Sequence, residues 1–281
     1  YCVIPSLRGP SRSRPMEYIL SECRDLASKG IGELIVVAQD ISKYGIDLTG
    51  RPQLVELLRE MAKIEGVEWI RLHYINPDGL SDELIELIAS EDKIVKYIDM
   101  PIQHISGRIL ADMTRHYTPE DVKEKIAKLR RIENMVIRTS LITGLPGEGE
   151  EEFQELCEFL RELRLERVGA FAFSPEEGTP AAEMEFVDNE IAVKRAETIE
   201  MIQSSIMDDW CDHMIGKTLE VLVDGFDEEA EQFYGRSYAD SPDIDGRVWI
   251  ATEEPIREGQ FVTVTIDGCI DGDLSGYITE E

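Results

Sequence analysis

The sequence predicts an α/β fold in which a parallel, TIM-barrel-like sheet is followed by a small antiparallel β-barrel. From Glu17 to about His213, short apolar runs alternate with amphipathic helical segments, as in parallel strands joined by helical crossovers. Polar, glycine and proline residues follow each apolar run, where α/β barrels bind ligands. After Gly216 the apolar runs become shorter and are separated by turn dipeptides. The predicted domains are therefore residues 1–213 and 214–281.

Five apolar runs are the predicted strands of the first domain, over residues 33–38, 69–73, 95–100, 136–142 and 168–173. Amphipathic segments between and around them predict helices near residues 15–29, 53–64, 81–89, 119–131 and 150–163. Thr118 followed by Pro119 is a typical helix start, because threonine caps the helix and proline suits its first position. A long helix over about residues 189–213 is expected to close the domain.

The second domain is predicted from five short runs of strand-forming residues, at 217–224, 233–238, 247–251, 260–267 and 274–279. The dipeptides Asp245-Gly246, Glu258-Gly259 and Asp267-Gly268 indicate turns between them. Five strands within about 65 residues favour a small barrel by their spacing.

The chain is strongly acidic, with 29 Lys and Arg against 58 Asp and Glu among its 281 residues. A formal net charge of −29 repels the phosphate backbone of nucleic acids and attracts a basic protein. The alternative explanation is a general surface acidity that only keeps the protein soluble.

No apolar run approaches the length of a membrane span, and no signal peptide opens the chain. The five cysteines are scattered and odd in number, which argues against a disulfide scaffold and for a reducing, cytoplasmic location. Four of them are expected to pack as small apolar residues: Cys23, Cys157, Cys211 and Cys269.

Unusual residues follow all five predicted strands. They are Gln39-Asp40, Asn76-Pro77, and the segments 101–104, 143–148 and 174–179. Because the carboxyl ends of parallel strands share one rim, these segments predict one shared ligand site. Of the two histidines near this rim, His73 is expected to be structural, whereas His104 suits a structural and a ligand-binding role equally well.

The stretch 139–148 is the most informative of these loops. Its glycines allow a ligand to approach the backbone closely, and a helix is predicted to start just beyond it. A plain strand-to-helix turn is the alternative. The stretch is neither a Walker loop, since no Gly-Lys-Ser/Thr follows, nor a dinucleotide fingerprint, since Gly-x-Gly-x-x-Gly is absent.

Residues 1–9, Tyr-Cys-Val-Ile-Pro-Ser-Leu-Arg-Gly, are followed by Arg-Ser-Arg-Pro at 12–15. Together they resemble the stretch just after the Cys-x-x-x-Cys-x-x-Cys motif of the methylthiotransferases, which are radical S-adenosylmethionine (SAM) enzymes. On this resemblance Cys2 is the last of three cysteines that bind an iron–sulfur cluster. One thiolate alone cannot hold such a cluster. Further matches lie at residues 37–48, 69–74, 99–104, 138–148 and 174–181.

The resemblance implies a [4Fe–4S] cluster that binds SAM, and a second cluster in the full-length protein. Cleavage of SAM gives a 5′-deoxyadenosyl radical, which takes a hydrogen atom from the target before a sulfur-bearing group is added. An electron donor such as flavodoxin or ferredoxin is implied. The residues assigned by resemblance to the SAM pocket are Gln39, Arg138, Thr139, Gly144, Gly147 and Glu148, with Ser174 as a weaker candidate.

Residues 235–246 resemble the TRAM domain of the branch that modifies an aspartate of the twelfth protein of the small ribosomal subunit. Residues 214–281 carry 4 Lys and Arg and 17 Asp and Glu, a net charge of −13. A domain that grips tRNA is expected to be basic, so a basic ribosomal protein is the predicted partner and tRNA is disfavoured. Asp240, Asp243 and Asp245 are expected on an acidic docking face.

Three other interpretations stay open: a tRNA methylthiotransferase, a non-catalytic docking module, and a metabolic barrel enzyme without a cluster. The sequence also departs from the family pattern. Its N-terminal domain and two of the three radical-cluster cysteines are not in this chain, so the chain alone is expected to be inactive. His116 stands where the family usually has the second of two arginines, and residues 271–276 lack the usual aromatic side chains of the closing strand.

Overall fold

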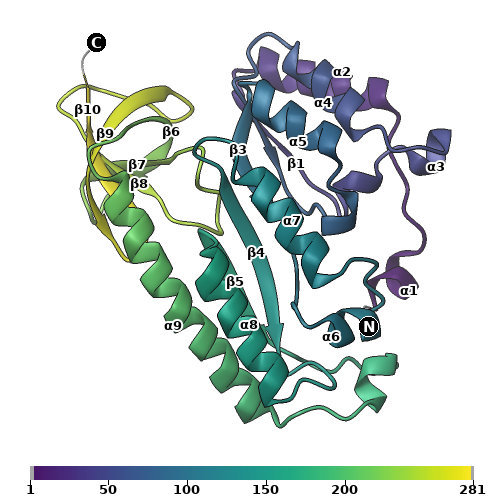
Figure 1. Ribbon diagram of the computed structural model, residues 1–281. Helices are drawn as coiled ribbons and strands as arrows, with labels where there is room; N and C mark the ends of the chain where they lie inside the picture. Colours follow the sequence, from purple (N-terminus) through teal and green to yellow (C-terminus); the bar gives the residue numbers. More distant parts are fainter. Residues whose placement is uncertain (1–2, 280–281) are drawn as a thin grey trace.

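The computed structural model describes residues 3–279, and its first domain is built on a five-stranded parallel sheet (Figure 1). The strands lie in the order β1-β2-β3-β4-β5. They are β1 (Glu33–Val36), β2 (Trp69–Leu72), β3 (Ile94–Asp99), β4 (Val136–Thr143) and β5 (Arg167–Ala172). Because all four pairings are parallel, the carboxyl ends share one edge, and the predicted parallel sheet is confirmed. The described strands form an open sheet, with β1 and β5 as its edges.

Helices cover one face of this sheet, which is called the outer face below. They include α2 (Met16–Ser28), α4 (Leu54–Ala62), α5 (Asp82–Ser90), α7 (Pro119–Leu129) and α8 (Glu150–Leu163). Helix α7 begins as predicted: Thr118 and Asp121 form a reciprocal capping box, and Pro119 occupies the first turn. The long helix α9 (Asn189–Met214) packs on β5 and α8 and leads to the second domain.

Side chains of each strand alternate between the outer face and an inner face. In β4, Ile137 and Leu141 belong to the core beneath the helices, whereas Val136 belongs to a separate cluster that includes second-domain residues. This period-two alternation assigns Arg138, Ser140 and Ile142 to the inner face. The inner face is therefore the surface on which the second domain and any ligand must meet the sheet.

Six short helical elements were not predicted, because fewer than two turns give no periodicity to detect. They are α1 (Ile4–Arg8), η1 (Ile41–Lys43), α3 (Ile46–Thr49), η2 (Pro77–Gly79), α6 (Gly107–Asp112) and η3 (Pro180–Glu183). Most of them lie in the connections that follow strands.

The second domain is a closed five-stranded barrel of strand order β10-β8-β7-β6-β9. Its strands are β6 (Thr218–Asp227), β7 (Gln232–Arg236), β8 (Val248–Ala251), β9 (Phe261–Ile270) and β10 (Asp273–Ile278). Four pairings are antiparallel as predicted, but β10 runs parallel to β8. The parallel pair arises because the ring has an odd number of strands: once four neighbouring pairs are antiparallel, the pair that closes the barrel must be parallel.

Two cysteines that were expected to pack as free thiols form a disulfide instead. Cys211, in the last turn of α9, is bonded to Cys269 of β9, with Cα atoms 5.8 Å apart. Cys23 and Cys157 are free and buried, as predicted. The expectation failed for the first pair because spacing along the chain does not reveal that α9 ends against β9.

Within residues 3–279, no helix is both long enough and apolar enough to cross a membrane.

Candidate functional site

The inner face of the sheet is divided into a covered half and an open half. The segment 237–246, which follows β7, lies against the amino-terminal half. Its Ala239 forms a buried cluster with Leu222 of β6 and with Trp69, Val95 and Tyr97 of the sheet. Trp69 also packs edge-on against Phe261 of the barrel, with ring centroids 5.0 Å apart. In Figure 1 the barrel accordingly lies beside the amino end of β4.

Two arginines from different domains share one buried carboxylate at this seam. Glu33 of β1 accepts from Arg71 Nε at 2.8 Å and from Arg236 Nη1 at 2.6 Å. Arg71 is fully buried and donates its remaining groups to the backbone oxygens of Ser237 and Tyr238. Arg236 is also paired with Asp224. Because every charge has a partner, the arrangement joins the domains without leaving a buried ion unpaired.

A second polar group crosses the seam at Asp245. Its Oδ2 accepts hydrogen bonds from Tyr97 Oη at 2.6 Å and from the Ser241 backbone. Its Oδ1 lies 3.8 Å from Nε of Arg138, and Arg138 donates at 2.8 Å to Asp99. Burial, reinforced by the negative charge of Asp245, raises the pKa of Tyr97 far above its ordinary value. Tyr97 is thus a fixed hydrogen-bond donor.

These contacts correct the predicted docking face on the TRAM-like segment. Asp240 is buried and paired with Arg167 at 3.0 Å, and Asp245 is enclosed in the seam. Asp243 alone of the three expected residues is exposed. Asp240 and Asp245 therefore face arginines of the same chain, across 73 or more residues, a pairing that the sequence does not show.

His73 also belongs to the seam. It is buried, and its Nε2 lies 2.9 Å from the hydroxyl of Ser241. Burial lowers the pKa of His73, so the ring is neutral near pH 7. This is the structural role expected from its position.

The open half of the inner face lies between this seam and the rim. Ile35 and Phe171 are exposed on it, at opposite edges of the sheet, and Ser140 lies between them. Apolar side chains on both edges, with polar groups between them, are typical of a ligand-binding surface. Arg138 and Asp99 lie where the open half meets the seam.

The loop after β4 is held by a buried carboxylate. Glu148 Oε1 accepts from the Gly144 backbone at 2.8 Å and from Arg195 of α9 at 2.7 Å. Its Oε2 faces Nε2 of His104 at 3.2 Å, outside good hydrogen-bond geometry, and neither atom has another partner in the described chain. Glu148 therefore organises its own loop through contacts with the protein.

The two glycines of this loop are explained by packing. Gly144 and Gly147 both have positive φ, at 75° and 81°. A Cβ atom on Gly144 would lie 2.4 Å from Cβ of Ala192, and one on Gly147 would lie 2.6 Å from the Arg108 guanidinium. Both positions therefore require glycine even without a ligand.

The nitrogen positions of His104 define its tautomer. Its Nδ1 accepts a hydrogen bond from the Ser106 backbone at 2.9 Å. Nδ1 therefore carries no proton, and the ring proton lies on Nε2, toward Glu148. His104 joins the loop after β3 to the loop after β4, so its observed contacts are structural.

The remaining predicted pocket residues lie at different depths. Gln39 and Ser174 are exposed at the rim, after β1 and β5 respectively. Thr139 lies on the outer face, where its hydroxyl accepts from the Ile102 backbone at 3.0 Å and holds the loop after β3. The structure brings the five strand ends to one rim, and the individual ligand contacts stay predictions. Cys2 lies outside the described residues.

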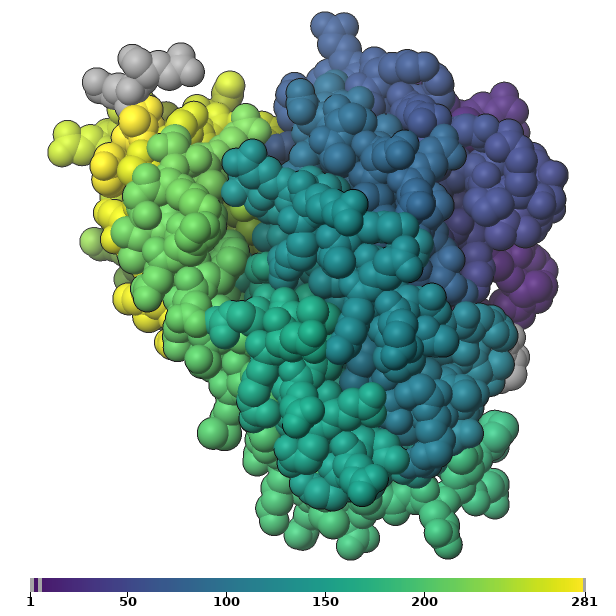
Figure 2. All heavy atoms as spheres, viewed as in Figure 1, coloured from purple at the N-terminus to yellow at the C-terminus, as the bar shows by residue number. Residues whose placement is uncertain are grey.

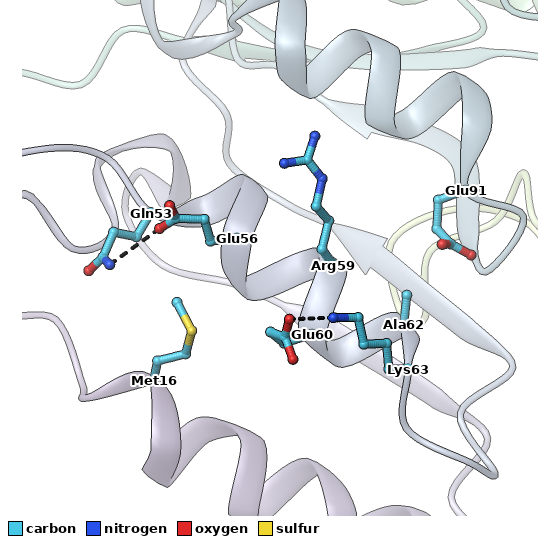
Figure 3. Close-up of a pocket in the computed structure, with 8 residues that line it drawn as sticks. All are labelled: Met16, Gln53, Glu56, Arg59, Glu60, Ala62, Lys63 and Glu91. Carbon is cyan, nitrogen blue, oxygen red and sulfur yellow. Dashed lines mark hydrogen bonds and ion pairs between the residues drawn. The ribbon is translucent and has the colours of Figure 1, made fainter.

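Two cavities lie outside the inner face, one on the helical side and one that reaches the rim at the edge of the sheet. The hollow in Figure 3 has a volume of 530 Å³ and lies on the helical side, between α2 and α4. Its polar residues form surface pairs such as Glu60 with Lys63. The second cavity, of 700 Å³, runs along the free edge of β1 beneath residues 11–14 and reaches the rim at Ala38 and Asp40.

Sequence reasoning missed the buried arginines that organise both the seam and the loop after β4: Arg71, Arg167, Arg195 and Arg236. A signal for Arg71 was present, since it interrupts the apolar run Trp69-Ile70-Arg71-Leu72. A charged residue at the centre of a buried strand requires a partner.

Curated relatives match this chain over almost its whole length. The "Ribosomal protein uS12 methylthiotransferase RimO" of Caldanaerobacter subterraneus subsp. tengcongensis is 47% identical over 277 residues, covering 98% of this chain and 63% of the relative. The protein of the same name from Clostridium botulinum strain Hall is 46% identical over 283 residues, covering 100% and 63%. The chain thus spans less than two thirds of the length of these relatives.

Solved structures resemble the chain more distantly. Coproporphyrinogen III oxidase (HemN) from Escherichia coli, described as a radical SAM enzyme, has a TM-score of 0.48 at 17% identity. The match covers 69% of this chain and 47% of that one.

Two family models match the two domains: the radical SAM superfamily over residues 1–160 and the TRAM domain over residues 215–278. The first implies a [4Fe–4S] cluster and SAM. Residues 3–279 contain no group of three or more side chains placed to bind a metal. Within them Cys23 and Cys157 are buried, and Cys211 and Cys269 are bonded together, so none is available as a cluster ligand. The parallel sheet, the closed barrel and the two family matches agree, and the chain belongs to the radical SAM superfamily.

Proposed function

We propose that the protein containing this chain is a methylthiotransferase that modifies an aspartate of ribosomal protein uS12, using SAM and two [4Fe–4S] clusters. The observation that carries the proposal is the 46–47% identity, over nearly the whole chain, to proteins named as uS12 methylthiotransferases. This identity extends through both domains, including the TRAM domain.

Cys2 is the proposed cluster ligand of this chain. When bound, the radical cluster and SAM supply a carbon radical able to remove hydrogen from an unactivated C–H bond. The second cluster is the proposed site from which the sulfur-bearing group is delivered. The protein contributes position and exclusion of water, since the cofactors carry the difficult chemistry.

We infer that SAM lies on the open half of the inner face, near Gln39, Arg138 and Ser174 at its borders. Arg138 borders this surface in a fixed orientation, because its guanidinium is paired with Asp99 and lies near Asp245. The positions of Thr139, Gly144, Gly147 and Glu148 favour an indirect role, in which they shape the loops that border the pocket.

The proposed partners are uS12 and an electron donor such as flavodoxin or ferredoxin, which places the reaction in the cytoplasm. A ribosomal protein that binds RNA is basic, and a net charge of −29 favours its approach. The same charge disfavours tRNA as the substrate.

The test is a reconstitution of the full-length protein with iron, sulfide, SAM and a reductant, followed by mass spectrometry of the products. Incubation with uS12 is expected to give a methylthio group on an aspartate peptide, and incubation with tRNA is expected to give none. The matched control is the Cys2→Ala variant, which should bind uS12 but leave SAM uncleaved. Modification of tRNA with none of uS12 would overturn the proposal.

A further inference from the structure

An aromatic track leads from the open half of the inner face to the outside of the molecule. Phe171 and Phe173 lie two residues apart along the edge strand β5 and its end, so they share the inner face. Phe171 is 56% exposed. Phe173 packs edge-on against Phe186, with ring centroids 5.4 Å apart, and Phe186 is itself 41% exposed.

Phe186 belongs to the segment 174–190, which is called the β5–α9 lip below. Its neighbour Met184 is exposed, and so is Ile191 just beyond the lip. Exposed methionine and phenylalanine side chains that continue a ligand-binding face are typical of a surface that another protein covers. The lip lies at the lower end of the molecule in Figure 2, on the side to which β4 points in Figure 1.

The lip is also uniformly acidic. It contains six carboxylates and no lysine, arginine or histidine: Glu176, Glu177, Glu183, Glu185, Asp188 and Glu190. All six are exposed, and in the described part of the chain none is paired with a basic side chain. By contrast, Asp240 and Asp245 of the second domain are enclosed at the seam, where they face Arg167 and Arg138. The lip therefore presents six unpaired carboxylates beside the candidate site.

The lip is held to the candidate site. The backbone N–H of Gly147 donates to the backbone carbonyl oxygen of Glu185 at 3.2 Å. Val187 packs closely against Gly144, since a Cβ atom added to Gly144 would lie 3.2 Å from the Val187 side chain. A partner that binds the lip would therefore meet a surface already positioned against the loop 144–148. Such preorganisation lowers the cost of binding.

We propose that the β5–α9 lip, with Phe171 and Phe186, is the docking surface for a basic loop of the protein substrate, which runs along the aromatic track toward the open half of the inner face. The proposal rests on the proposed function. Apolar contacts with Phe171, Met184 and Phe186 supply the covered centre of the interface, and the six carboxylates supply a rim that attracts lysine and arginine. The second domain is then held rigidly against the sheet, and the protein substrate binds at the opposite end of the first domain, on the lip.

The experiment compares two matched charge reversals in the full-length, cluster-loaded protein. The lip variant is Glu183→Lys with Glu185→Lys, and the control is Glu228→Lys with Glu229→Lys in the turn between β6 and β7, where both residues are equally exposed. Binding of purified uS12 is measured at several salt concentrations. The lip variant should weaken binding at least about tenfold at low salt and flatten its salt dependence, because the net charge of the lip falls from −6 to −2. The control should change binding less than about twofold.

A third variant, Met184→Ser with Phe186→Ser, separates apolar contact from charge. It should weaken binding while keeping the salt dependence of the wild type. Equal effects of the lip and control reversals would overturn the docking surface even if uS12 is modified. A wild-type protein that neither binds nor modifies uS12 would overturn the proposed function as well, and binding of tRNA at the lip would replace a protein partner by a nucleic acid.

Discussion

Tyr97 of the sheet donates a hydrogen bond to Asp245 of the TRAM-like segment at 2.6 Å, across 148 residues of sequence. The pair lies within a seam that also contains Glu33 between Arg71 and Arg236. Removing one partner of a buried polar group leaves the other unsatisfied, which costs more than the hydrogen bond itself contributes. The two domains are therefore expected to unfold as one unit.

The first prediction concerns Asp245→Asn, which removes the charge that faces Arg138 and keeps the side-chain size. The free energy of unfolding should fall by about 1–3 kcal/mol. Asp243→Asn is the matched control, because Asp243 is exposed two residues away and should change the free energy by less than about 0.5 kcal/mol. Urea denaturation followed by circular dichroism measures both. Equal values for the two variants would show that the seam does not depend on this carboxylate.

The second prediction concerns alkaline pH. Burial raises the pKa of Tyr238 to about 12, above an unfolded value of about 10. Below pH 10 both states keep the proton, and above it the unfolded state loses the proton first, so stability is lost as the pH rises toward 12. Tyr238→Phe should flatten this loss, because phenylalanine has no group that ionises. The substitution breaks no hydrogen bond of the described structure, since the Tyr238 hydroxyl makes none there. Unfolding free energies measured at intervals between pH 9 and 12 provide the check, and parallel curves for the two proteins would contradict the prediction.

The parallel strands and the long helices follow from local pattern, and the sequence predicts them well. Alternation of apolar runs with amphipathic segments indicates parallel strands, because only a helical crossover connects such neighbours. The capping box at Thr118 and Asp121 is readable for the same reason, since all its atoms lie within four residues. The parallel pairing of β8 with β10 could not be predicted from local pattern, because it depends on how the barrel closes.

The site was predictable only in part. The rim could be anticipated, since five strand ends must meet at one edge. Side-chain direction could not: Thr139 faces the helices while Arg138 faces the inner surface, and Glu148 turns toward Arg195 of a helix 47 residues away. A resemblance between motifs assigns a residue to a loop, whereas packing decides whether it contacts a ligand or another residue.

The third prediction concerns the bond between Cys211 and Cys269. In the chain-entropy description, closing a loop of 58 residues stabilises the folded protein by about 4 kcal/mol. Cys211→Ser with Cys269→Ser should lower the free energy of unfolding by up to that amount. A reductant should destabilise the wild type and leave the double variant unchanged. Peptide mapping under non-reducing conditions checks the link directly, and two free thiols at these positions would refute it.

The last prediction concerns Glu148→Gln in the loop after β4. Glu148 accepts from Gly144 and Arg195 on one oxygen and faces His104 on the other. An amide has only one acceptor atom. If its oxygen keeps Gly144 and Arg195, its NH₂ group meets the Nε2–H of His104, and two donors face each other. If the amide turns over, Arg195 loses its buried carboxylate partner. Either arrangement should lower the free energy of unfolding by about 3 kcal/mol.

Glu151→Gln is the matched control, since Glu151 is exposed in the first turn of α8, just after this loop, and its substitution should cost less than about 1 kcal/mol. Nitrogen-15 NMR of the histidine side chains gives an independent readout. In the wild type the proton of His104 should lie on Nε2, because the Ser106 backbone donates to Nδ1. In Glu148→Gln this resonance should shift or broaden, as the ring loses its carboxylate neighbour. An unchanged His104 signal together with unchanged stability would show that Glu148 does not hold the loop, and that its charge is available to a ligand instead.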